Sequence, residues 1–465
     1  MPLISSIAYL MLLGLVGYAA LSLFLGCEKR PLAEVFALSG MLGCTMVPLI
    51  LFWLSLAGAR LGRTVLLGVF IASLFGLYPI WRKRGLVVPT WRMPRLTKVD
   101  WLLAPSLVLI VWSLITVTQL ALKYPLIEWD GVSTWGFKAK ILALASGPEL
   151  HDYFHDFSLN FSHLDYPLLT PFLTAGLYGA IGEVDDTLGK AGILFLFWCY
   201  AIFVYVAART HLPRYMAAAV TALAVSAPLV LRWAGQGTAD MPLAIFYAGS
   251  IYYLVRWILG GTIGDAWLAG IFSVACLFTK NEGLPLAVIN LFAATVFGWK
   301  NLPRARYARE LGAVVIGCGV CALPWILFRH SLPHIDENYP GHLNLSVIAS
   351  NRDRVPWLLN QFFLWMFRQP DSNFVWQLAA GALVIGLCTR PSPAALIMLF
   401  LLLAHLSVYL LAYTITPLPL DYLVFVTWKR LLLHTFPAGV FILMFSLSKI
   451  VPNPASASQS PISAE

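Results

Sequence analysis

The sequence predicts an all-α polytopic membrane protein, and three observations carry this prediction. Of the 465 residues, 59% are hydrophobic and only 11% are charged, and the mean hydropathy is +0.78. Soluble domains contain about a quarter charged residues, so this chain lacks the polar side chains needed to cover a water-facing surface. Apolar runs approaching the roughly 20 residues that cross a bilayer recur from end to end. Lys and Arg gather in short connections between those runs, as topology-determining charges do.

The apolar runs divide the chain into thirteen expected spans. Runs shorter than 20 residues are tolerated where neighbouring helices shield them or the bilayer thins. Residues 1–100 form a three-span N-terminal extension, residues 101–449 the main bundle, and 450–465 a disordered cytoplasmic tail rich in Pro, Ser and Ala. The expected spans are 3–25, 35–57, 64–81, 101–122, 188–208, 214–232, 241–258, 265–280, 284–299, 311–328, 372–388, 394–414 and 431–449.

The charge distribution predicts an orientation. With the loop Arg82–Asp100 in the cytoplasm, basic residues outnumber acidic ones on that side, and acidic residues accumulate on the other. The N-terminus is then outside and the C-terminus inside. Because Tyr166–Gly182 contains two prolines and three glycines, we expect a juxtamembrane helix on the outer face there rather than a span. The outer loops are Lys123–Thr187, Arg329–Asp371 and Thr414–His434.

Two other classes of protein are disfavoured. The net charge of +9 lies in clusters beside apolar runs rather than along a groove, so nucleic acid is not an expected partner. The seven cysteines lie in or beside apolar runs, which supports neither a disulfide framework nor a zinc site.

The first candidate site follows the span 101–122, in the segment EWDGVSTWGFKAK. Glu128 and Asp130 are carboxylates at the membrane edge, where one can act as a general base, and Trp135 can pack against a sugar ring. An interfacial aromatic belt with snorkelling lysines such as Lys138 explains the same residues equally well.

A second group lies in HLDYPLLTP. His163, Asp165 and Tyr166 precede a proline-rigidified segment. They can bind a metal or a sugar hydroxyl, although such residues more often cap the following helix.

Three further positions place charges close to the membrane plane, where ionisable residues are often functional. Asp240, in GQGTADMPL, is either a helix N-cap or a ligand-binding carboxylate. Lys280 and Glu282, in FTKNEG, either pair with each other or bind an anion such as phosphate. Lys429, Arg430 and His434 gather at the outer start of the last span, where Arg430 can make bidentate contacts to a phosphate or can simply snorkel.

No nucleophile elbow, P-loop, HExxH or dinucleotide motif is present, so nucleotide donors are not supported. Taken in order, however, EWDG, DYPLL, TADMPL and FTKNEG resemble the motifs of the GT-C class of membrane glycosyltransferases. The sequence is similar to bacterial lipopolysaccharide-core galacturonosyltransferases and to dolichyl-phosphate-mannose protein mannosyltransferases. The resemblance covers Trp101–Trp299 well and the Arg430/His434 segment less surely.

The resemblance implies a GT-C-like bundle that transfers a sugar from a polyprenyl-phosphate carrier to a glycan, lipid or protein acceptor. The active face would be periplasmic, on the bacterial inner membrane. It implies Asp130 as the base, with Glu128 able to exchange roles with it, and a divalent metal is left open as the only cofactor. The lipid phosphate would be held by Lys280, Arg430 and Lys138, and the sugar, acceptor or metal contacted by Asp240, His163, Asp165, Tyr166, Glu282, His434 and Trp135.

A transporter or flippase for a lipid-linked sugar is the competing expectation. Such proteins place charges at mid-membrane on broken helices. Here the charges gather at one predicted face, which favours the enzyme.

Overall fold

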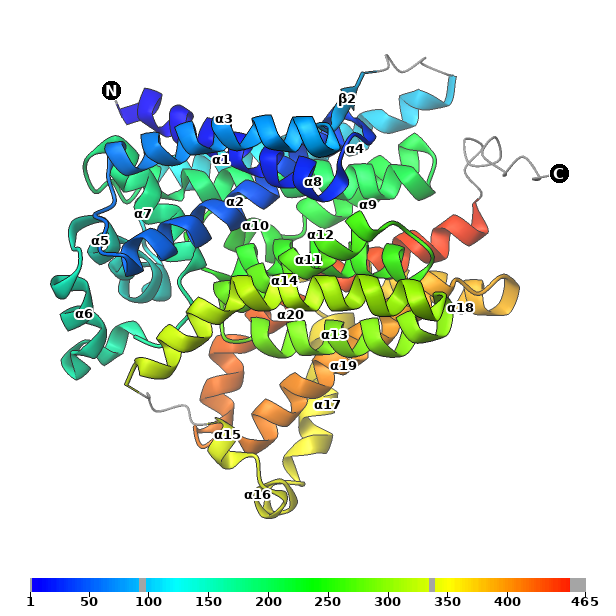
Figure 1. The fold of residues 1–465 in the computed structure, drawn as a ribbon. Coiled ribbons are helices and arrows are strands. Elements are labelled where there is room, and N and C mark those ends of the chain that lie inside the picture. The colour runs from blue at the N-terminus through cyan, green and yellow to red at the C-terminus, as the bar shows by residue number, and fades with distance from the viewer. Residues whose placement is uncertain (1, 92–97, 334–338, 452–465) are drawn as a thin grey trace.

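The computed structural model describes residues 2–91, 98–333 and 339–451, and its regular structure is almost entirely helical (Figure 1). Two three-residue strands are the exception in these ranges. Strands β1 (Lys29–Pro31) and β2 (Val88–Thr90) pair in parallel, with Lys29 opposite Val88. They join the chain after the first helix to the chain after the third. The predicted all-α class is confirmed.

Within the described residues, nine helices are long and apolar enough to cross a bilayer. Each overlaps one of the expected spans, and two of them begin with a short 3₁₀ turn, η1 (Lys98–Leu102) or η4 (Leu188–Lys190). The expected outer loop Thr414–His434 was wrong in its second part, because the last helix already begins at Leu420. The nine are α1 (Pro2–Leu25), α2 (Leu32–Leu56), α3 (Arg63–Arg84), α4 (Leu103–Lys123), α8 (Ala191–His211), α13 (Gly283–Asn301), α14 (Arg304–Ser331), α19 (Pro393–Ile415) and α20 (Leu420–Ile450).

The other four expected spans also fold as helices, but the count of thirteen spans is not confirmed. The run 214–232 is broken: its two helices meet at an angle of 61°, next to Pro228. Counting this pair as one span gives ten in the described part of the chain. The elements concerned are α9 (Arg214–Val225) with α10 (Pro228–Ala234), then α11 (Asp240–Ile258), α12 (Ile263–Thr279) and α18 (Val375–Thr389).

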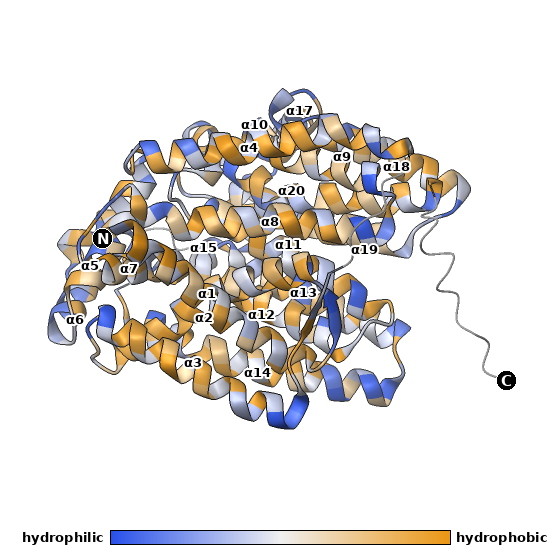
Figure 2. Cartoon of the chain, turned by 90° about the horizontal axis from the view of Figure 1, so that it is seen from above, coloured by the Kyte–Doolittle hydropathy of each residue, from blue (hydrophilic) through white to orange (hydrophobic). Residues whose placement is uncertain are grey.

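The helices differ in how much of their apolar surface the protein itself covers. In α2 and α20, 83% of the most apolar segment is buried, whereas in α3 and α4 only 11% is buried. Large apolar side chains such as Phe75 and Ile316 point outward and are 75% and 70% exposed. Figure 2 shows the resulting hydrophobic colouring along α3, α4 and α14 at the periphery. Such outward apolar surface suits lipid rather than water, as expected of a multi-pass membrane protein.

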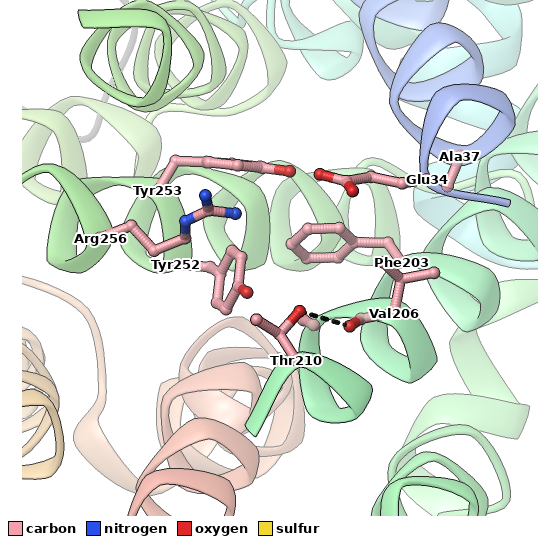
Figure 3. A pocket seen from close by; sticks show the side chains of 9 residues that line it. Glu34, Ala37, Phe203, Val206, Thr210, Tyr252, Tyr253 and Arg256 are labelled. Atoms are coloured by element: carbon pink, nitrogen blue, oxygen red, sulfur yellow. Dashed lines mark hydrogen bonds between the residues drawn. The ribbon is translucent and has the colours of Figure 1, made fainter. Parts of the chain in front are cut away.

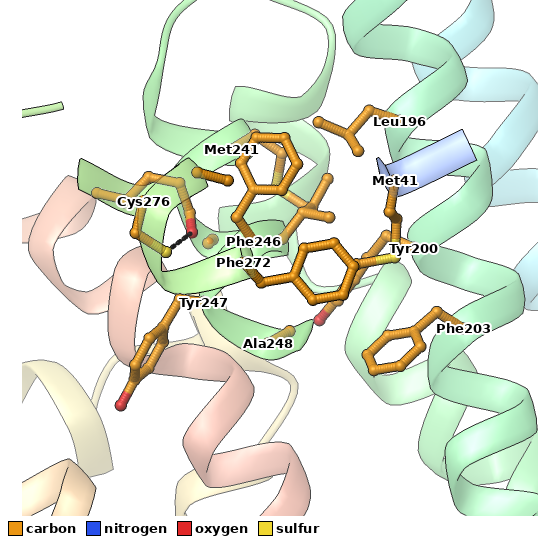
Figure 4. Packing of buried hydrophobic residues seen from close by; sticks show 14 of the residues in the cluster. Met41, Leu196, Tyr200, Phe203, Met241, Phe246, Tyr247, Ala248, Phe272 and Cys276 are labelled. Carbon is orange, nitrogen blue, oxygen red and sulfur yellow. Dashed lines mark hydrogen bonds between the residues drawn. The ribbon is translucent and has the colours of Figure 1, made fainter. Parts of the chain in front are cut away.

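The N-terminal helices share the core of the main bundle. Helix α1 crosses α2 so closely that a Cβ on Gly17 would lie 1.7 Å from the backbone oxygen of Ser39. Figure 4 shows Met41 of α2 among aromatic side chains of α8, α11 and α12. A Cβ on Gly249 of α11 would lie 3.1 Å from the Met41 side chain and 2.7 Å from Phe272. Helices α1 and α2 therefore pack directly against each other, and α2 packs against the helices of the main bundle.

The expected juxtamembrane segment Tyr166–Gly182 contains helix α7 (Leu169–Ile181). Its 13 residues rise only about 20 Å, too little to cross a hydrocarbon core of about 30 Å, so a full span is excluded as expected. Its placement on the outer surface was wrong. All its residues except Ala180 are buried, and Tyr9 of α1 donates a hydrogen bond to the Leu173 oxygen. The N-terminal helices cover it.

The remaining short elements lie in two places in Figure 1. Helices α5 and α6 lie at the end of the bundle where α1 begins, and α15, α16 and α17 lie below α19. Helix α20 ends at the opposite end of the bundle, as the predicted orientation of the termini requires. The tail 452–465 and the loop segments 92–97 and 334–338 lie outside the described residues. The short elements are the π-helical turn η2 (Gly131–Gly136), α5 (Phe137–Leu144), α6 (Pro148–His155), η3 (Phe157–Ser162), α15 (Tyr339–His342), α16 (Leu345–Ser350), α17 (Arg354–Phe367) and η5 (Pro370–Ser372).

Candidate functional site

The centre of the candidate site is the carboxylate of Asp240, the first residue of α11. Its side chain does not cap the helix; the N-cap position is Ala239, and no side-chain cap forms. Instead, Oδ1 lies 2.9 Å from the Lys280 Nζ, and 3.1 Å from both the Arg430 Nε and the His434 Nε2. Asp240 is fully buried. A carboxylate is buried at this depth only because cations surround it.

Two separate segments deliver these basic side chains. Lys280 follows α12, in the three-residue connection to α13, while Arg430 and His434 lie one turn apart on α20. The spacing of four residues puts Arg430 and His434 on the same face of α20, so both reach Asp240. The structure therefore brings four of the predicted residues into one cluster.

Arg430 links this cluster to the first candidate motif. Its Nη2 lies 2.6 Å from the Asp130 Oδ2, while its Nε holds Asp240. The guanidinium also lies over the ring of Trp233, 5.6 Å from the ring centre, at a cation–π distance. Arg430 thus bridges two carboxylates that are 110 residues apart in the sequence, and it is itself supported by an aromatic face.

Lys280 has a second carboxylate partner, because its Nζ lies 2.7 Å from the Glu282 Oε1. Burial alone would raise the pKa of Glu282, but the Lys280 ammonium outweighs it and holds that pKa below its usual value. Glu282 therefore stays ionised at neutral pH. The expected Lys280–Glu282 pair forms, and it shares its lysine with Asp240. We call Asp130, Asp240, Lys280, Glu282, Arg430 and His434 the ionic cluster.

The local fold around Asp130 is unusual. It immediately precedes the turn η2, a rare π-helical geometry that is often associated with function. A Cβ on Gly131 would approach the Gln236 oxygen to 3.1 Å, so this turn packs against the chain leading into α11. From the other side, the Lys190 Nζ donates to the backbone oxygen of Tyr124 at 2.6 Å, which fixes the chain before Asp130.

Another group of predicted residues forms an aromatic layer beside Asp130. The ring of Tyr166 stacks on His163 with centres 4.4 Å apart, and it lies 5.9 Å from the ring of Trp135. The Nζ of Lys138 is buried behind them and donates to the backbone oxygens of His163 and Tyr166. Lys138 therefore supports the turn at 163–166 instead of pointing into the ionic cluster.

The pKa values in this layer agree with that arrangement. Burial lowers the pKa of Lys138 to about 7, against a partial opposing effect of Asp165. Burial and the nearby Lys138 ammonium also lower the pKa of His163. Both groups are thus largely uncharged slightly above neutral pH.

Two predicted residues lie apart from the ionic cluster. Asp165 pairs with Arg329, at the end of α14, at 3.6 Å. Glu128 is half-exposed, and within the described residues its side chain makes no ion pair or hydrogen bond. Of the two carboxylates in EWDG, only Asp130 reaches the ionic cluster.

Sequence reasoning missed several residues that complete the site. Trp233 lies under Arg430, and the Tyr409 hydroxyl lies 3.4 Å from the Nδ1 of His434. Neither stood out, because the chain has 17 Trp and 18 Tyr residues. Buried polar atoms without a hydrogen-bond partner in the described residues include the Asp240 Oδ2, the Gln236 Oε1 and the Trp135 Nε1. Orphaned atoms beside a charged cluster are positions where ligand hydroxyls or water bind.

For a metal ion, the described residues offer little. They contain no group of three or more His, Cys, Asp or Glu side chains placed to hold one. The carboxylates of the ionic cluster face cations of the protein instead. The divalent metal stays a prediction.

A further polar cluster lies near the opposite end of α11, between α2, α8 and α11 (Figure 3). Glu34 of α2 binds Arg30 at 2.7 Å and faces a cavity that Tyr252, Tyr253 and Arg256 also line. The cavity holds about 10 Å³, roughly one water molecule. The cavity is too small for a substrate. It lies where side chains of α2 and α11 meet, so the polar residues around it have a structural role between these helices.

Comparison of the chain with models of known protein families, with curated proteins and with solved structures found no match.

Proposed function

We propose that the protein is a membrane glycosyltransferase that moves a sugar from a polyprenyl-phosphate carrier to a glycan, lipid or protein acceptor. The observation that supports this proposal is the ionic cluster. In it Arg430 bridges Asp130 and Asp240, and Lys280, from the connection between α12 and α13, binds Asp240. This is a set of fixed cations beside a partly exposed carboxylate.

The chemistry needs those two kinds of group. When the sugar leaves, the lipid phosphate gains negative charge, which cations stabilise. The attacking hydroxyl must lose a proton, and a carboxylate within reach can accept it. Lys280 and Arg430 supply the first function and Asp130 the second. The orphaned Asp240 Oδ2 and the aromatic layer of Trp135 and Tyr166 provide an acceptor atom and ring faces for a sugar.

An apolar cavity whose lining on α12 ends three residues before Lys280 supports a lipid carrier as substrate. It has a volume of about 200 Å³ and lies between α11, α12, α13 and α14. On α12 its lining runs from Ala266 to Leu277, about 16 Å along the helix, and Leu277 is only three residues from Lys280. At Gly319 of α14 nothing lies within 4 Å of where a Cβ would be, so this glycine leaves part of the space open. An apolar chain attached to a phosphate at Lys280 has a place to lie.

The position of the charges separates this proposal from a transporter. Asp240, Lys280 and Glu282 all lie at helix ends, and α11, α12 and α13 are unbroken beyond them. A carrier that moves a lipid-linked sugar across the membrane needs charged sites accessible from both sides in turn. The broken pair α9 and α10 is the element closest to that pattern, and it contributes the Trp233 ring beneath Arg430 rather than a charge.

The direct test supplies membranes of cells expressing the protein with radiolabelled polyprenyl-phosphate sugars, tested one sugar at a time. We expect label to enter a lipid, glycan or protein fraction, Asp130→Asn to abolish the transfer at unchanged protein abundance, and Lys280→Met to abolish it per amount of folded protein. Asp353→Asn is the control, because the Asp353 side chain is 95% exposed and its ion-pair partner is Arg352, which is not part of the ionic cluster.

Two outcomes would contradict the proposal. Transfer at the wild-type rate by Asp130→Asn would remove Asp130 from the mechanism. Movement of an intact lipid-linked sugar across vesicle membranes, with no transfer to any acceptor, would favour the transporter.

A further inference from the structure

The cations of the ionic cluster are already matched by carboxylates. Lys280 lies between Asp240 and Glu282, and Arg430 lies between Asp130 and Asp240. Three carboxylates thus face two fixed cations, and the His434 imidazole adds one positive charge only if it is protonated. An arriving phosphate finds no spare positive charge. It binds well only if a carboxylate moves away from a cation.

The burial of the carboxylates indicates which one moves. The side chain of Asp240 is fully buried and is held by Lys280, Arg430 and the His434 imidazole, so it cannot leave. The side chain of Asp130 is 33% exposed and has one ion-pair partner, at 2.6 Å. It sits at the start of the π-helical turn η2, in the chain between α4 and α5 and outside any spanning helix. Asp130 is therefore the carboxylate that can be exchanged at the least cost.

Arg430 would keep its place if Asp130 moved. Its Nε remains bound to Asp240, and its guanidinium remains over the ring of Trp233. Only the Nη2 edge, which now faces Asp130, would become free. That edge presents planar N–H donors of the kind that bind phosphate oxygens.

From this geometry we infer that the phosphate of the lipid donor replaces Asp130 on Arg430, so that Asp130 becomes available as a base only when the donor is bound. The inference rests on the proposed function. In the unliganded protein an oxygen of Asp130 accepts a charge-assisted hydrogen bond from Arg430 and is not available to an acceptor hydroxyl. Donor binding and activation of the base are then one event.

The transfer step balances with no further reactant. The acceptor hydroxyl gives its proton to the released Asp130 carboxylate, and its oxygen forms a bond to the anomeric carbon of the donor sugar. The bond from that carbon to the phosphate oxygen breaks, and its electron pair stays on the phosphate. The lipid phosphate diester becomes a monoester with one more negative charge, which Arg430 and Lys280 stabilise. Asp130 later returns its proton to water.

The exchange predicts an effect on binding that a simple catalytic base would not produce. In Asp130→Asn the competing carboxylate is gone, so polyprenyl phosphate should bind about three- to tenfold more tightly than to the wild type, the scale of a partly exposed ion pair with a charge-assisted hydrogen bond. The dissociation constant is measured with polyprenyl phosphate and the full-length protein in lipid nanodiscs, by the change in tryptophan fluorescence. Asp130→Ala should show the same tightening, which guards against an effect of the new amide.

The matched control is Glu183→Gln, which removes one negative charge from an exposed position just after α7. It should bind polyprenyl phosphate as the wild type does. If both Asp130 variants bind as the wild type or more weakly, the exchange is refuted while the proposed function stands. If the wild type itself does not bind polyprenyl phosphate, the proposed function fails.

Discussion

The buried carboxylate of Asp240 gives the sharpest test of the ionic cluster as a structural unit. Asp240→Asn keeps the shape of the side chain and removes its charge. Two cations then lose a carboxylate partner, Lys280 at 2.9 Å and Arg430 at 3.1 Å, and the His434 imidazole loses a contact at 3.1 Å.

The expected cost follows from burial. Removing one partner of a buried ion pair costs about 3–5 kcal/mol, because the remaining charge is left without compensation. Here Lys280 keeps Glu282 and Arg430 keeps Asp130, so neither cation is left alone. We therefore expect the lower end of that range, about 3 kcal/mol of unfolding free energy.

The measurement is reversible unfolding in mixed micelles with increasing dodecyl sulfate, followed by tryptophan fluorescence. Asp353→Asn makes the same chemical change at an exposed position and should leave the midpoint unchanged. An Asp240→Asn midpoint equal to that of the wild type would show that the carboxylate does not hold these cations. A double-mutant cycle with Lys280→Met should show strong non-additivity, since the two residues are in direct contact.

Two further predictions concern other parts of the chain. The pKa of Lys138 is lowered to about 7, whereas an unfolded lysine titrates near 10.5. Between these two pH values the unfolded state binds more protons than the folded state. The free energy of unfolding should therefore rise with pH by up to about 1.4 kcal/mol per pH unit. Lys138→Met should flatten that rise in unfolding titrations from pH 7 to 10, and a wild-type profile that is already flat would refute the burial of a neutral Lys138. Gly17→Ala should destabilise the protein by about 1–3 kcal/mol because its Cβ would meet the Ser39 oxygen. Gly14→Ala, in the same helix with nothing within 4 Å, should not, and equal midpoints for the two would exclude the close α1–α2 crossing.

Much of the bundle was predictable because lipid-facing helices must be apolar along their whole length. Helices such as α3 and α14 expose their side chains outward, so composition alone locates them. Helix α7 was misplaced for the converse reason. Composition does not distinguish a short apolar helix on the membrane surface from one that other helices enclose, and Tyr9 and its neighbours enclose α7 only in three dimensions.

The candidate residues were predictable one by one but their pairing was not. Ionisable residues in so apolar a chain are costly to bury, which is why Asp240, Lys280 and Arg430 stand out. Their contacts, however, join positions 40 and 190 residues apart. The periodicity of one helix does not predict which residues of other helices its side chains contact. The same limit explains Lys138, whose charge suggested a phosphate but whose partners are the backbone oxygens of His163 and Tyr166.

The N-terminal helices bear on the site although none of their residues belongs to it. Met41 of α2 packs behind Gly249 of α11, and Asp240 is the first residue of that same helix (Figure 4). At the far end of α11, Glu34 faces Arg256 and Tyr253 across the small cavity. Side chains of α2 thus contact α11 at its middle and near its end. Ion-pair distances near 3 Å tolerate little movement of α11, so the packing of neighbouring helices against it, α2 among them, bears on the geometry of the ionic cluster.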